Sequence, residues 1–262
     1  MSEYTSFFEI AGKITHIKKG DVLYVVSDIL ELVKQSREHG EKFDRDVFLD
    51  TLKELVGEEG TLLIPTFNWD FCKGIAFDYH KTPCKTGALG NCALRRQDFL
   101  RTKHPIYSFA VWGKDKDFLV SMDEPNSFGK NSIFDYMYER NAKALVIGLD
   151  AMDGLTFMHH VEQMVGVPYR FEKTFTADYT DALGETTKKS YTMYVRDLDM
   201  DAQENTKHFS QILEDLNVSH TQIFNEVPFR TVKLREVYEI ERIDIVCNDC
   251  RNIYIYKGQP EK

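Results

Sequence analysis

The chain has 262 residues, of which 42% are hydrophobic, and a formal net charge of −9 at pH 7. This length suits one large domain or two modest ones, and the apolar content is enough for a sizeable core, which excludes a disordered chain. The negative charge argues against a nucleic-acid binder, because neutralising phosphates requires clustered Lys and Arg. We therefore expect a globular protein that acts on small molecules.

The start of the chain has no basic segment followed by an apolar one, so no signal peptide is predicted. No run reaches the ~18 apolar residues that a membrane-spanning helix requires. The five cysteines, an odd number, suit a reducing compartment. We expect a cytoplasmic protein with no membrane partner.

The first part of the chain places a helical pattern between two apolar runs. Residues 21–27 and 60–67 predict buried strands, and the apolar spacing over 44–56 predicts a helix between them. This order is typical of a βαβ unit and a largely parallel sheet. Residues 68–103 have little periodicity, and we expect a long ordered loop region there with a short helix near 96–101.

The middle of the chain continues the alternation of helices and strands. We expect a strand at 107–112, a helix at 132–140, a strand at 144–149 and a helix at 153–166. Together with the first part, these elements predict an α/β fold. Its three-layer core would have a mixed, largely parallel central sheet flanked by helices.

After Pro168 the pattern changes to alternating apolar and polar residues, which predicts an antiparallel extension. The expected elements are strands at 171–177 and 190–196, a helix at 201–216, and short strands at 243–247 and 253–256. Since no linker or repeat interrupts the chain, we predict one domain over residues 1–262.

The helix at 153–166 carries the residues best suited to catalysis. Thr156, His159 and Glu162 are spaced three apart, which places them along one face of a helix. A neutral imidazole can take a proton from a nucleophile, and a neighbouring carboxylate can fix its tautomer. The alternative is a half-buried structural histidine. His160 points about 100° away and is expected to be structural.

Other sites have weaker support. A metal centre built on His159 and Glu162 would need a second such pair, and the sequence offers none. Cys247 and Cys250 form a lone C-x-x-C at the end of a predicted strand, which we interpret as structural. A cysteine nucleophile acting with His159 stays open. Phosphate-binding glycine motifs and G-x-S-x-G are absent.

Pro105 forces His104 into an extended conformation at the start of a strand. This could direct His104 into a cleft, with Ser108 a little further on. A simple turn into the strand explains the same residues.

Taken together, these segments resemble the aminoglycoside 3-N-acetyltransferase family, also called the antibiotic N-acetyltransferases. The resemblance covers roughly residues 20–170 and consists of six ordered blocks. These are Gly20–Asp28, Gly60–Phe67, Phe77-Asp78 with Thr82-Pro83 and Gly87, Arg101–Ser108 with Gly113, Phe128-Gly129 with Ser132, and Thr156-x-x-His159-x-x-Glu162 with Pro168-Tyr169-Arg170.

The resemblance implies an N-acetyltransferase that uses acetyl-CoA as co-substrate and no metal. His159 would be the base, with Glu162 and Thr156 in the same catalytic block. The cofactor would be bordered by two segments: Val26, Ser27 and Asp28 in one, and His104, Pro105 and Ser108 in the other. Residues 20–170 would form the cofactor and catalytic core, and residues 171–262 would shape the acceptor site.

The chain departs from the family at Val26, where His is common, and at Asp28, where a second Ser is common. It is also short for a drug-modifying member, which favours an amine smaller than an aminoglycoside, such as an amino sugar, free or nucleotide-linked. Antibiotic resistance is the role implied for aminoglycoside-modifying members. The alternatives are a catalytically silent acyl-CoA-binding protein and a metal-dependent hydrolase. If the protein forms an oligomer, we expect a homodimer.

Overall fold

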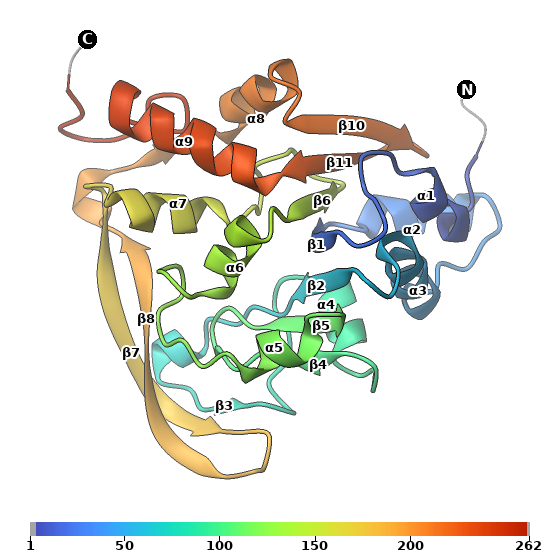
Figure 1. Cartoon of the computed structure of the whole chain (residues 1–262), viewed down its shortest axis with the longest axis horizontal. Helices are drawn as coiled ribbons and strands as arrows, with labels where there is room; N and C mark the ends of the chain where they lie inside the picture. The colour runs from blue at the N-terminus through green and yellow to red at the C-terminus, as the bar shows by residue number, and fades with distance from the viewer. Residues whose placement is uncertain (1–3, 261–262) are drawn as a thin grey trace.

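The computed structural model describes residues 4–260, which build a seven-stranded mixed sheet between two layers of helices (Figure 1). The strand order is β10-β11-β6-β1-β2-β5-β4. The strands are β1 (Val22–Ser27), β2 (Thr61–Pro65), β4 (Leu100–Arg101), β5 (Phe109–Gly113), β6 (Lys143–Ile147), β10 (Ser219–Phe224) and β11 (Val227–Lys233).

The centre of the sheet is parallel and its flanks are antiparallel. β1 pairs in parallel with β2 on one side and with β6 on the other. The outer pairs β2–β5, β5–β4, β6–β11 and β11–β10 are all antiparallel. The predicted mixed sheet with a parallel centre is therefore confirmed.

Strand β1 shows why the sheet is covered on both faces. Successive side chains of a strand point to opposite faces, and here both faces of β1 are buried. Tyr24 and Val26 join one apolar cluster, and Leu23 and Val25 join the other. The continuous apolar run follows from this double burial.

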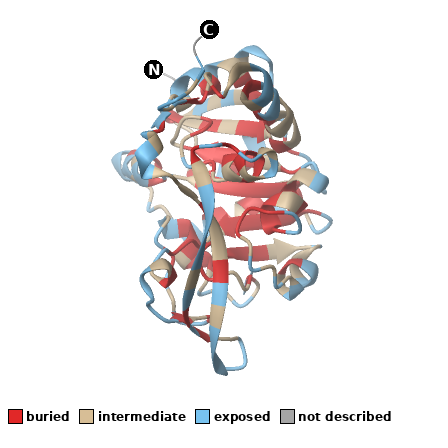
Figure 2. Ribbon diagram, turned by 90° about the vertical axis from the view of Figure 1, so that its left-hand side faces the viewer, coloured by how far each residue is buried: buried red, intermediate tan, exposed pale blue. Residues whose placement is uncertain are grey.

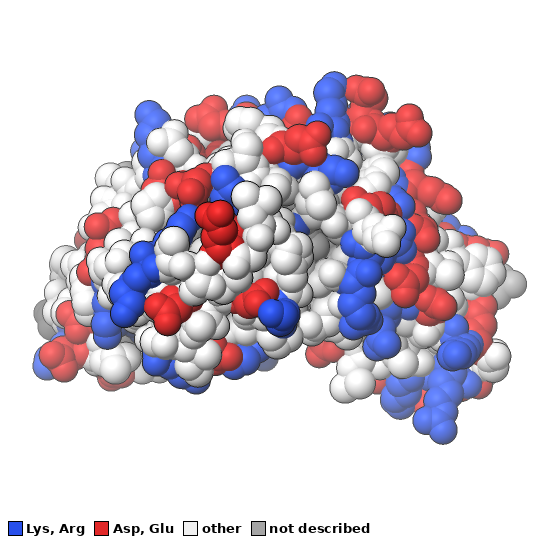
Figure 3. All heavy atoms as spheres, turned by 90° about the horizontal axis from the view of Figure 1, so that it is seen from below, with Lys and Arg blue, Asp and Glu red and all other residues white. Residues whose placement is uncertain are grey.

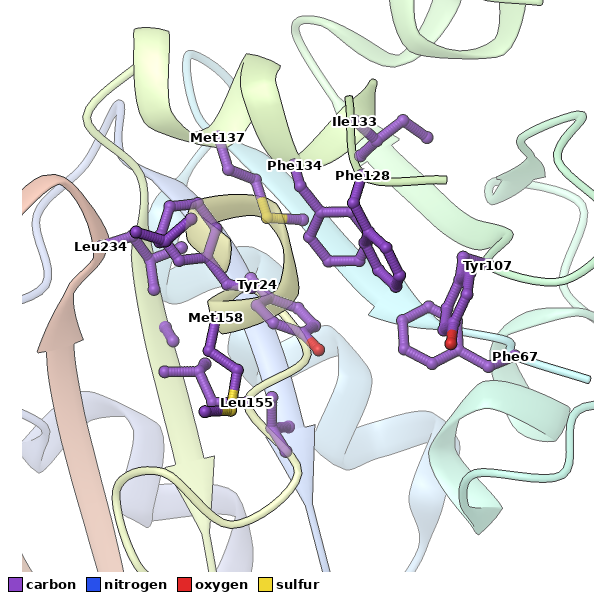
Figure 4. Packing of buried hydrophobic residues seen from close by; sticks show 14 of the residues in the cluster. Tyr24, Phe67, Tyr107, Phe128, Ile133, Phe134, Met137, Leu155, Met158 and Leu234 are labelled. Atoms are coloured by element: carbon purple, nitrogen blue, oxygen red, sulfur yellow. The ribbon is translucent and has the colours of Figure 1, made fainter. Parts of the chain in front are cut away.

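Each apolar cluster is completed by its own helices, which confirms the three-layer core. Leu23 and Val25 face α1 (Phe7–Lys13), α2 (Leu30–Glu38), α3 (Arg45–Val56) and α4 (Ala88–Ala93). Tyr24 and Val26 face α5 (Lys116–Ser121), α6 (Ile133–Glu139), α7 (Met158–Val165), α8 (Thr206–Asp215) and α9 (Leu234–Asn248). Figure 4 shows part of this second cluster, where Tyr24 lies near Leu155 and Met158.

The antiparallel extension begins with a long hairpin of β7 (Arg170–Thr180) and β8 (Thr186–Arg196), as predicted. Figure 2 shows this hairpin running along the outside of the body, with much of its length exposed. The remaining short elements are β3 (Phe77–Asp78), which pairs with β7, β9 (Gln203–Glu204), which pairs with β12 (Tyr254–Ile255), and the 3-10 turns η1 (Phe71–Lys73) and η2 (Leu198–Met200).

Two predicted elements are wrong. The helix expected near 96–101 lies earlier, as α4, and Leu100 and Arg101 instead pair with β5. The strand expected at 243–247 is part of α9. Its apolar residues Ile243 and Val246 are 53% and 62% exposed, so this part of the helix carries apolar residues on its outer side, and the run looked like a buried strand.

Two predicted helices also start later than expected, with α7 beginning at Met158 and α8 at Thr206. Turns occupy the residues just before α7. In the part of the chain that the structure describes, no helix is long and apolar enough to cross a membrane.

Candidate active site

The loop that leads from β6 into α7 is held against the end of β1. The amide of Asp28 donates to the carbonyl of Ile147. Gly148 follows with φ +74°, and a Cβ there would lie 2.3 Å from the carbonyl oxygen of Asp28. Only glycine fits this position without a shift. The close approach brings the carboxyl ends of two parallel strands together, where α/β proteins place their sites.

His159 and Glu162 form a hydrogen-bonded pair on the first turns of α7. Nδ1 of His159 lies 2.7 Å from Oε2 of Glu162. Glu162 is completely buried, whereas 22% of the His159 side chain is exposed. The carboxylate can only accept, so Nδ1 carries the proton and Nε2 holds the free lone pair.

Two residues at the start of the hairpin hold Glu162 from its other sides. The hydroxyl of Tyr169 donates to Oε1 over 3.1 Å, and Nε of Arg170 lies 2.8 Å from Oε2. Burial raises the pKa of Glu162, but His159, Arg170 and Tyr169 outweigh it and the pKa is lowered. Glu162 is therefore an ionised carboxylate inside the protein.

The same surroundings keep His159 neutral. Burial is the largest cause that lowers its pKa below 6.5, and the charge of Arg170 acts in the same direction. Glu162 and Glu204 oppose the shift without reversing it. A neutral imidazole with an oriented free nitrogen is what a general base requires at neutral pH.

His159 opens into a cavity of about 410 Å³. The cavity is lined by the loop before α7 and by the start of the C-terminal half: Met152, Asp153, Gly154, Leu155, Thr156, Met158, His159, Glu204 and Thr206. Thr156 lies in the turn before α7 and not on its helical face, but the structure still brings it to the same cavity as His159. We call this space the His159 cavity.

The predicted cofactor segment at the end of β1 lies beside three glycines. A Cβ at Gly154 would lie 3.4 Å from Val26, a Cβ at Gly87 would lie 3.7 Å from the carbonyl oxygen of Ser27, and Gly148 approaches Asp28 as described. The side chain of Asp28 accepts from the amide of Leu30 and so closes its own turn.

His104 has both ring nitrogens engaged in its own loop. Nδ1 accepts from the amide of Tyr107 over 3.1 Å, so Nε2 carries the proton and donates to Ser127 Oγ over 3.2 Å. Burial lowers the pKa of His104 to about 3, and the ring stays neutral. No nitrogen remains for a substrate.

Ser108 lies in a buried network around Arg101, and Pro105 is also buried. The hydroxyl of Ser108 accepts from Nε of Arg101 over 3.0 Å and donates to the carbonyl of Thr66 over 3.1 Å. The guanidinium also donates to the carbonyl of Thr82 over 2.6 Å. This network ties the end of β2 to the loop before β4.

The aromatic side chains of Phe128 and Tyr107, both labelled in Figure 4, lie between the His104 block and His159. Phe128 is fully buried, with its ring centre 4.7 Å from that of Tyr107 and 5.3 Å from that of His159. His104 lies beyond Tyr107, at 6.2 Å. The structure therefore does not bring His104, Pro105 and Ser108 to the cavity that His159 opens into.

Sequence reasoning assigned no role to several residues that the structure brings to the site. Tyr169 and Arg170 were recognised only as part of the last family block, and their position directly after α7 was the available signal. Asp153 was considered only as a cap for the helix at 153–166. Glu204 and Thr206 had no signal, because they reach the cavity from β9 and α8, far along the chain.

The remaining candidates take no part in this site as nucleophiles or metal ligands. Cys247 is exposed and belongs to α9, while Cys250 is buried with Sγ 3.1 Å from the Tyr169 hydroxyl. Burial raises the pKa of Cys250, which disfavours a thiolate. Over residues 4–260, no group of three or more His, Cys, Asp or Glu side chains could hold a metal ion.

The fold is that of the aminoglycoside acetyltransferases. AAC-IIIb, in a binary structure with CoASH, superposes with a TM-score of 0.78 at 14% identity, covering 99% of this chain and 100% of that one. AAC(3)-Xa gives a TM-score of 0.76 at 16% identity and 91% coverage of each chain. YokD from Bacillus subtilis gives 0.73 at 19% identity and 97% coverage of each.

The sequence comparisons give the family. The family model described as aminoglycoside 3-N-acetyltransferase matches residues 36–242. The chain belongs to this family, as the resemblance predicted. A curated relative, the SPbeta prophage-derived aminoglycoside N(3')-acetyltransferase-like protein YokD of Bacillus subtilis (strain 168), is 27% identical over 146 residues. That match spans 47% of this chain and about half, 52%, of the relative.

Proposed function

We propose that the protein transfers the acetyl group of acetyl-CoA to the amine of an aminoglycoside or a smaller amino sugar. The observation that carries this proposal is the free Nε2 of a neutral His159, which faces a cavity while Nδ1 is fixed by the buried Glu162. Family membership and the CoASH in the AAC-IIIb structure support acetyl-CoA as the donor.

The residues at the end of β1 fit the acyl end of coenzyme A. The glycines let the neighbouring loops pack tightly against this strand end, because a Cβ at Gly148 would lie 2.3 Å from the carbonyl oxygen of Asp28. Val26, Ser27 and Asp28 lie beside Gly87, Gly148 and Gly154, and Gly154 and Thr156 also line the His159 cavity. We assign the thioester end of the cofactor to this junction.

The amine attacks the thioester directly. The free amine adds to the carbonyl carbon while Nε2 of His159 takes a proton from its nitrogen. Glu162 stabilises the imidazolium that forms, because its charge lies against Nδ1. The C–S bond then breaks, the thiolate takes the proton from His159, and an acetamide and free CoA are released. General-base help of this kind is worth roughly 10²–10⁴-fold in rate.

Thr156 completes the proposed catalytic set. It lines the cavity beside His159, its hydroxyl donates to the carbonyl of Gly154 over 3.4 Å, and it also lies close to the buried hydroxyl of Tyr24. We assign it a hydrogen bond to the reacting groups. For His104, Pro105 and Ser108, the bonding described above supports a positioning role for the loops behind Phe128.

The division of labour within the chain follows the same residues. Residues 20–170 supply His159, Glu162 and the β1 junction, and residues 171–262 supply Glu204 and Thr206 to the cavity wall. The C-terminal part would therefore contact the acceptor amine.

The experiment is a thiol-release assay with acetyl-CoA and a panel of amines that includes aminoglycosides, free amino sugars and nucleotide-linked amino sugars. We expect free CoA to appear only when an acceptor amine is present, with one N-acetylated product per CoA released. CoA binding by calorimetry without turnover on any amine would replace this function with a silent acyl-CoA-binding protein. Hydrolysis that depends on an added metal ion would support the hydrolase alternative.

A further inference from the structure

Two side chains of β1 face the loop that leads into α7. A Cβ at Gly154 would lie 3.4 Å from Cγ1 of Val26. Tyr24, two residues earlier on the same face of the strand, has its hydroxyl close to Thr156. Figure 4 shows the Tyr24 ring near Leu155, which lies between these two loop residues in the chain. This face of β1 therefore supports the loop that lines the active-site cavity.

The hydroxyl of Tyr24 is an unusual group for this position. The side chain is buried in the apolar cluster on this face of the sheet, and within residues 4–260 its oxygen has no hydrogen-bond partner. Burial raises the pKa of Tyr24, against a smaller opposing influence from Thr156, so the hydroxyl keeps its proton. A buried hydroxyl without a partner is unfavourable, and its place beside Thr156 indicates a donor held for use at the site.

Thr156 carries the more available of the two hydroxyls in the His159 cavity. Its Oγ1 lies 3.4 Å from the carbonyl oxygen of Gly154, and that oxygen already accepts from the amide of Thr156 over 2.9 Å. The other hydroxyl that lines the cavity, that of Thr206, donates to Asp153 over 3.2 Å. The hydrogen of Thr156 is therefore the more readily redirected to a ligand.

Main-chain amides of the loop before α7 are engaged in turns. Four of them donate to carbonyls within the loop over 2.9–3.2 Å: those of Leu155, Thr156, Met158 and His159. Attack on a thioester places negative charge on the carbonyl oxygen, which requires a donor about 2.7–3.1 Å away. Because these four amides are already used, the hydroxyl of Thr156 is the donor that the loop offers through a side chain.

We propose that Tyr24 is a positioning residue for acetyl transfer: its hydroxyl donates to Oγ1 of Thr156, and Thr156 donates its own hydrogen to the thioester oxygen. This inference rests on the proposed function and adds a residue to its mechanism. A hydroxyl that accepts one hydrogen bond becomes a stronger donor for the next, because hydrogen bonds in a chain polarise one another. Neither hydroxyl gives up its proton, since both act only as hydrogen-bond donors.

The test is steady-state transfer from acetyl-CoA to sisomicin or D-glucosamine, whichever the wild type acetylates faster. A direct oxyanion donor is worth roughly 10²–10³-fold in kcat, and we expect a loss in this range for Thr156→Val. Thr156→Ser keeps the hydroxyl and should retain most of the activity. Tyr24→Phe should lower kcat roughly 10-fold and leave KM for acetyl-CoA within about 2-fold, because it removes only the support of Thr156.

A double variant and a matched control separate this role from a structural one. Adding Tyr24→Phe to Thr156→Val should lower kcat no further, because Tyr24 acts only through Thr156. Tyr191 on β8 is also buried, and over the described part of the chain its hydroxyl likewise has no partner. Tyr191→Phe should leave kcat unchanged.

Two results would overturn the inference. One is an equal kcat in the wild type, Tyr24→Phe and Tyr191→Phe. The other is a further loss when Tyr24→Phe is added to Thr156→Val, since a general disturbance of the core would act in both backgrounds.

If neither amine releases thiol, the proposed function fails separately. The infrared carbonyl band of bound acetyl-CoA, isotope-labelled at the carbonyl carbon, then tests the inference, because a donor to the thioester oxygen lowers its frequency. A lowered band in the wild type and Tyr191→Phe, with a smaller lowering in Tyr24→Phe, supports the role of Tyr24. The same band in all three proteins, or no binding of acetyl-CoA, would overturn it.

Discussion

Nδ1 of His159 lies 2.7 Å from Oε2 of Glu162, and Glu162 is the more deeply buried of the two. The carboxylate is thus set to orient the imidazole and to stabilise its charged form, and His159 lines the cavity. Burial lowers the pKa of His159 and Arg170 adds to that shift, while His159, Arg170 and Tyr169 together keep the pKa of Glu162 low.

Glu162→Gln should lower kcat by roughly 10²–10³-fold with little change in KM. An amide can hold the wrong tautomer of His159 and cannot offset the imidazolium charge. The measurement is steady-state acetyl transfer, with Tyr169→Phe as a milder companion that removes only the 3.1 Å bond to Oε1. An unchanged kcat in Glu162→Gln would show that the carboxylate does not assist the base.

On the acid side of the pH profile, we expect kcat to fall only below pH 6.5. The pKa of His159 is lowered from 6.5, so the base stays neutral until the pH falls below that value. Removing the neighbouring carboxylate removes an influence that raises this pKa, so Glu162→Gln should move the acid limb to still lower pH. A limb above 6.5 in the wild type would contradict the assignment of a buried, neutral base.

Gly148→Ala should destabilise the protein and weaken CoA binding together. Both Gly148 and Gly184 have positive φ, +74° and +85°, so alanine strains each by about 1 kcal/mol. At Gly148 the new Cβ would also lie 2.3 Å from the carbonyl oxygen of Asp28, whereas at Gly184 it meets nothing within 4 Å.

Thermal unfolding and CoA calorimetry on the two glycine variants separate these effects. We expect Gly184→Ala to lose a few degrees in Tm and to keep CoA affinity. Gly148→Ala should lose more than Gly184→Ala both in Tm and in CoA affinity, because the turn at Asp28 must move to make room for the new Cβ. If the two variants lost the same amount in Tm and in CoA affinity, the turn at the end of β1 would not belong to the cofactor site.

Glu241→Gln should stabilise the protein at neutral pH. Glu241 is fully buried on α9, and within residues 4–260 neither of its carboxyl oxygens has a hydrogen-bond partner. Burial raises its pKa well above 4.5, with Glu162 adding to the shift and Arg170 opposing it. The folded state therefore keeps a proton that the unfolded state releases above pH 4.5, which reduces stability as the pH rises.

Glutamine mimics the protonated acid without this cost, so the free energy of unfolding at pH 7 should rise on the order of 1–3 kcal/mol. Urea unfolding of the wild type and Glu241→Gln at a series of pH values is the measurement. The two curves should converge near pH 4.5. A variant that is less stable at every pH would mean that Glu241 is ionised and paired in solution.

The sequence was sufficient for the layers of the fold because its signals there are local. The apolar run of β1 and the apolar spacing of α3 each specify one element, and both elements were predicted correctly. α9 was misread because it exposes Ile243 and Val246 and buries Glu241, which reverses the usual pattern.

The candidate site also has one part that the sequence predicts and another part that it does not. His159 and Glu162 are three residues apart on one helix, so their contact could be expected from spacing alone. The contributions of Arg170 and Glu204 depend on how the hairpin and β9 pack against α7. That packing is a property of the whole fold, and no short spacing in the sequence encodes it.

The most direct test of the account is the rate of acetyl transfer by His159→Ala, measured beside CoA binding and Tm, with the exposed His208→Gln as control. The account predicts that His159→Ala binds CoA within about 3-fold of the wild type and keeps its fold. It should lose transfer by roughly 10²–10⁴-fold, the usual worth of a general base, while His208→Gln is unaffected. Transfer at the wild-type rate by a folded His159→Ala would contradict the central claim.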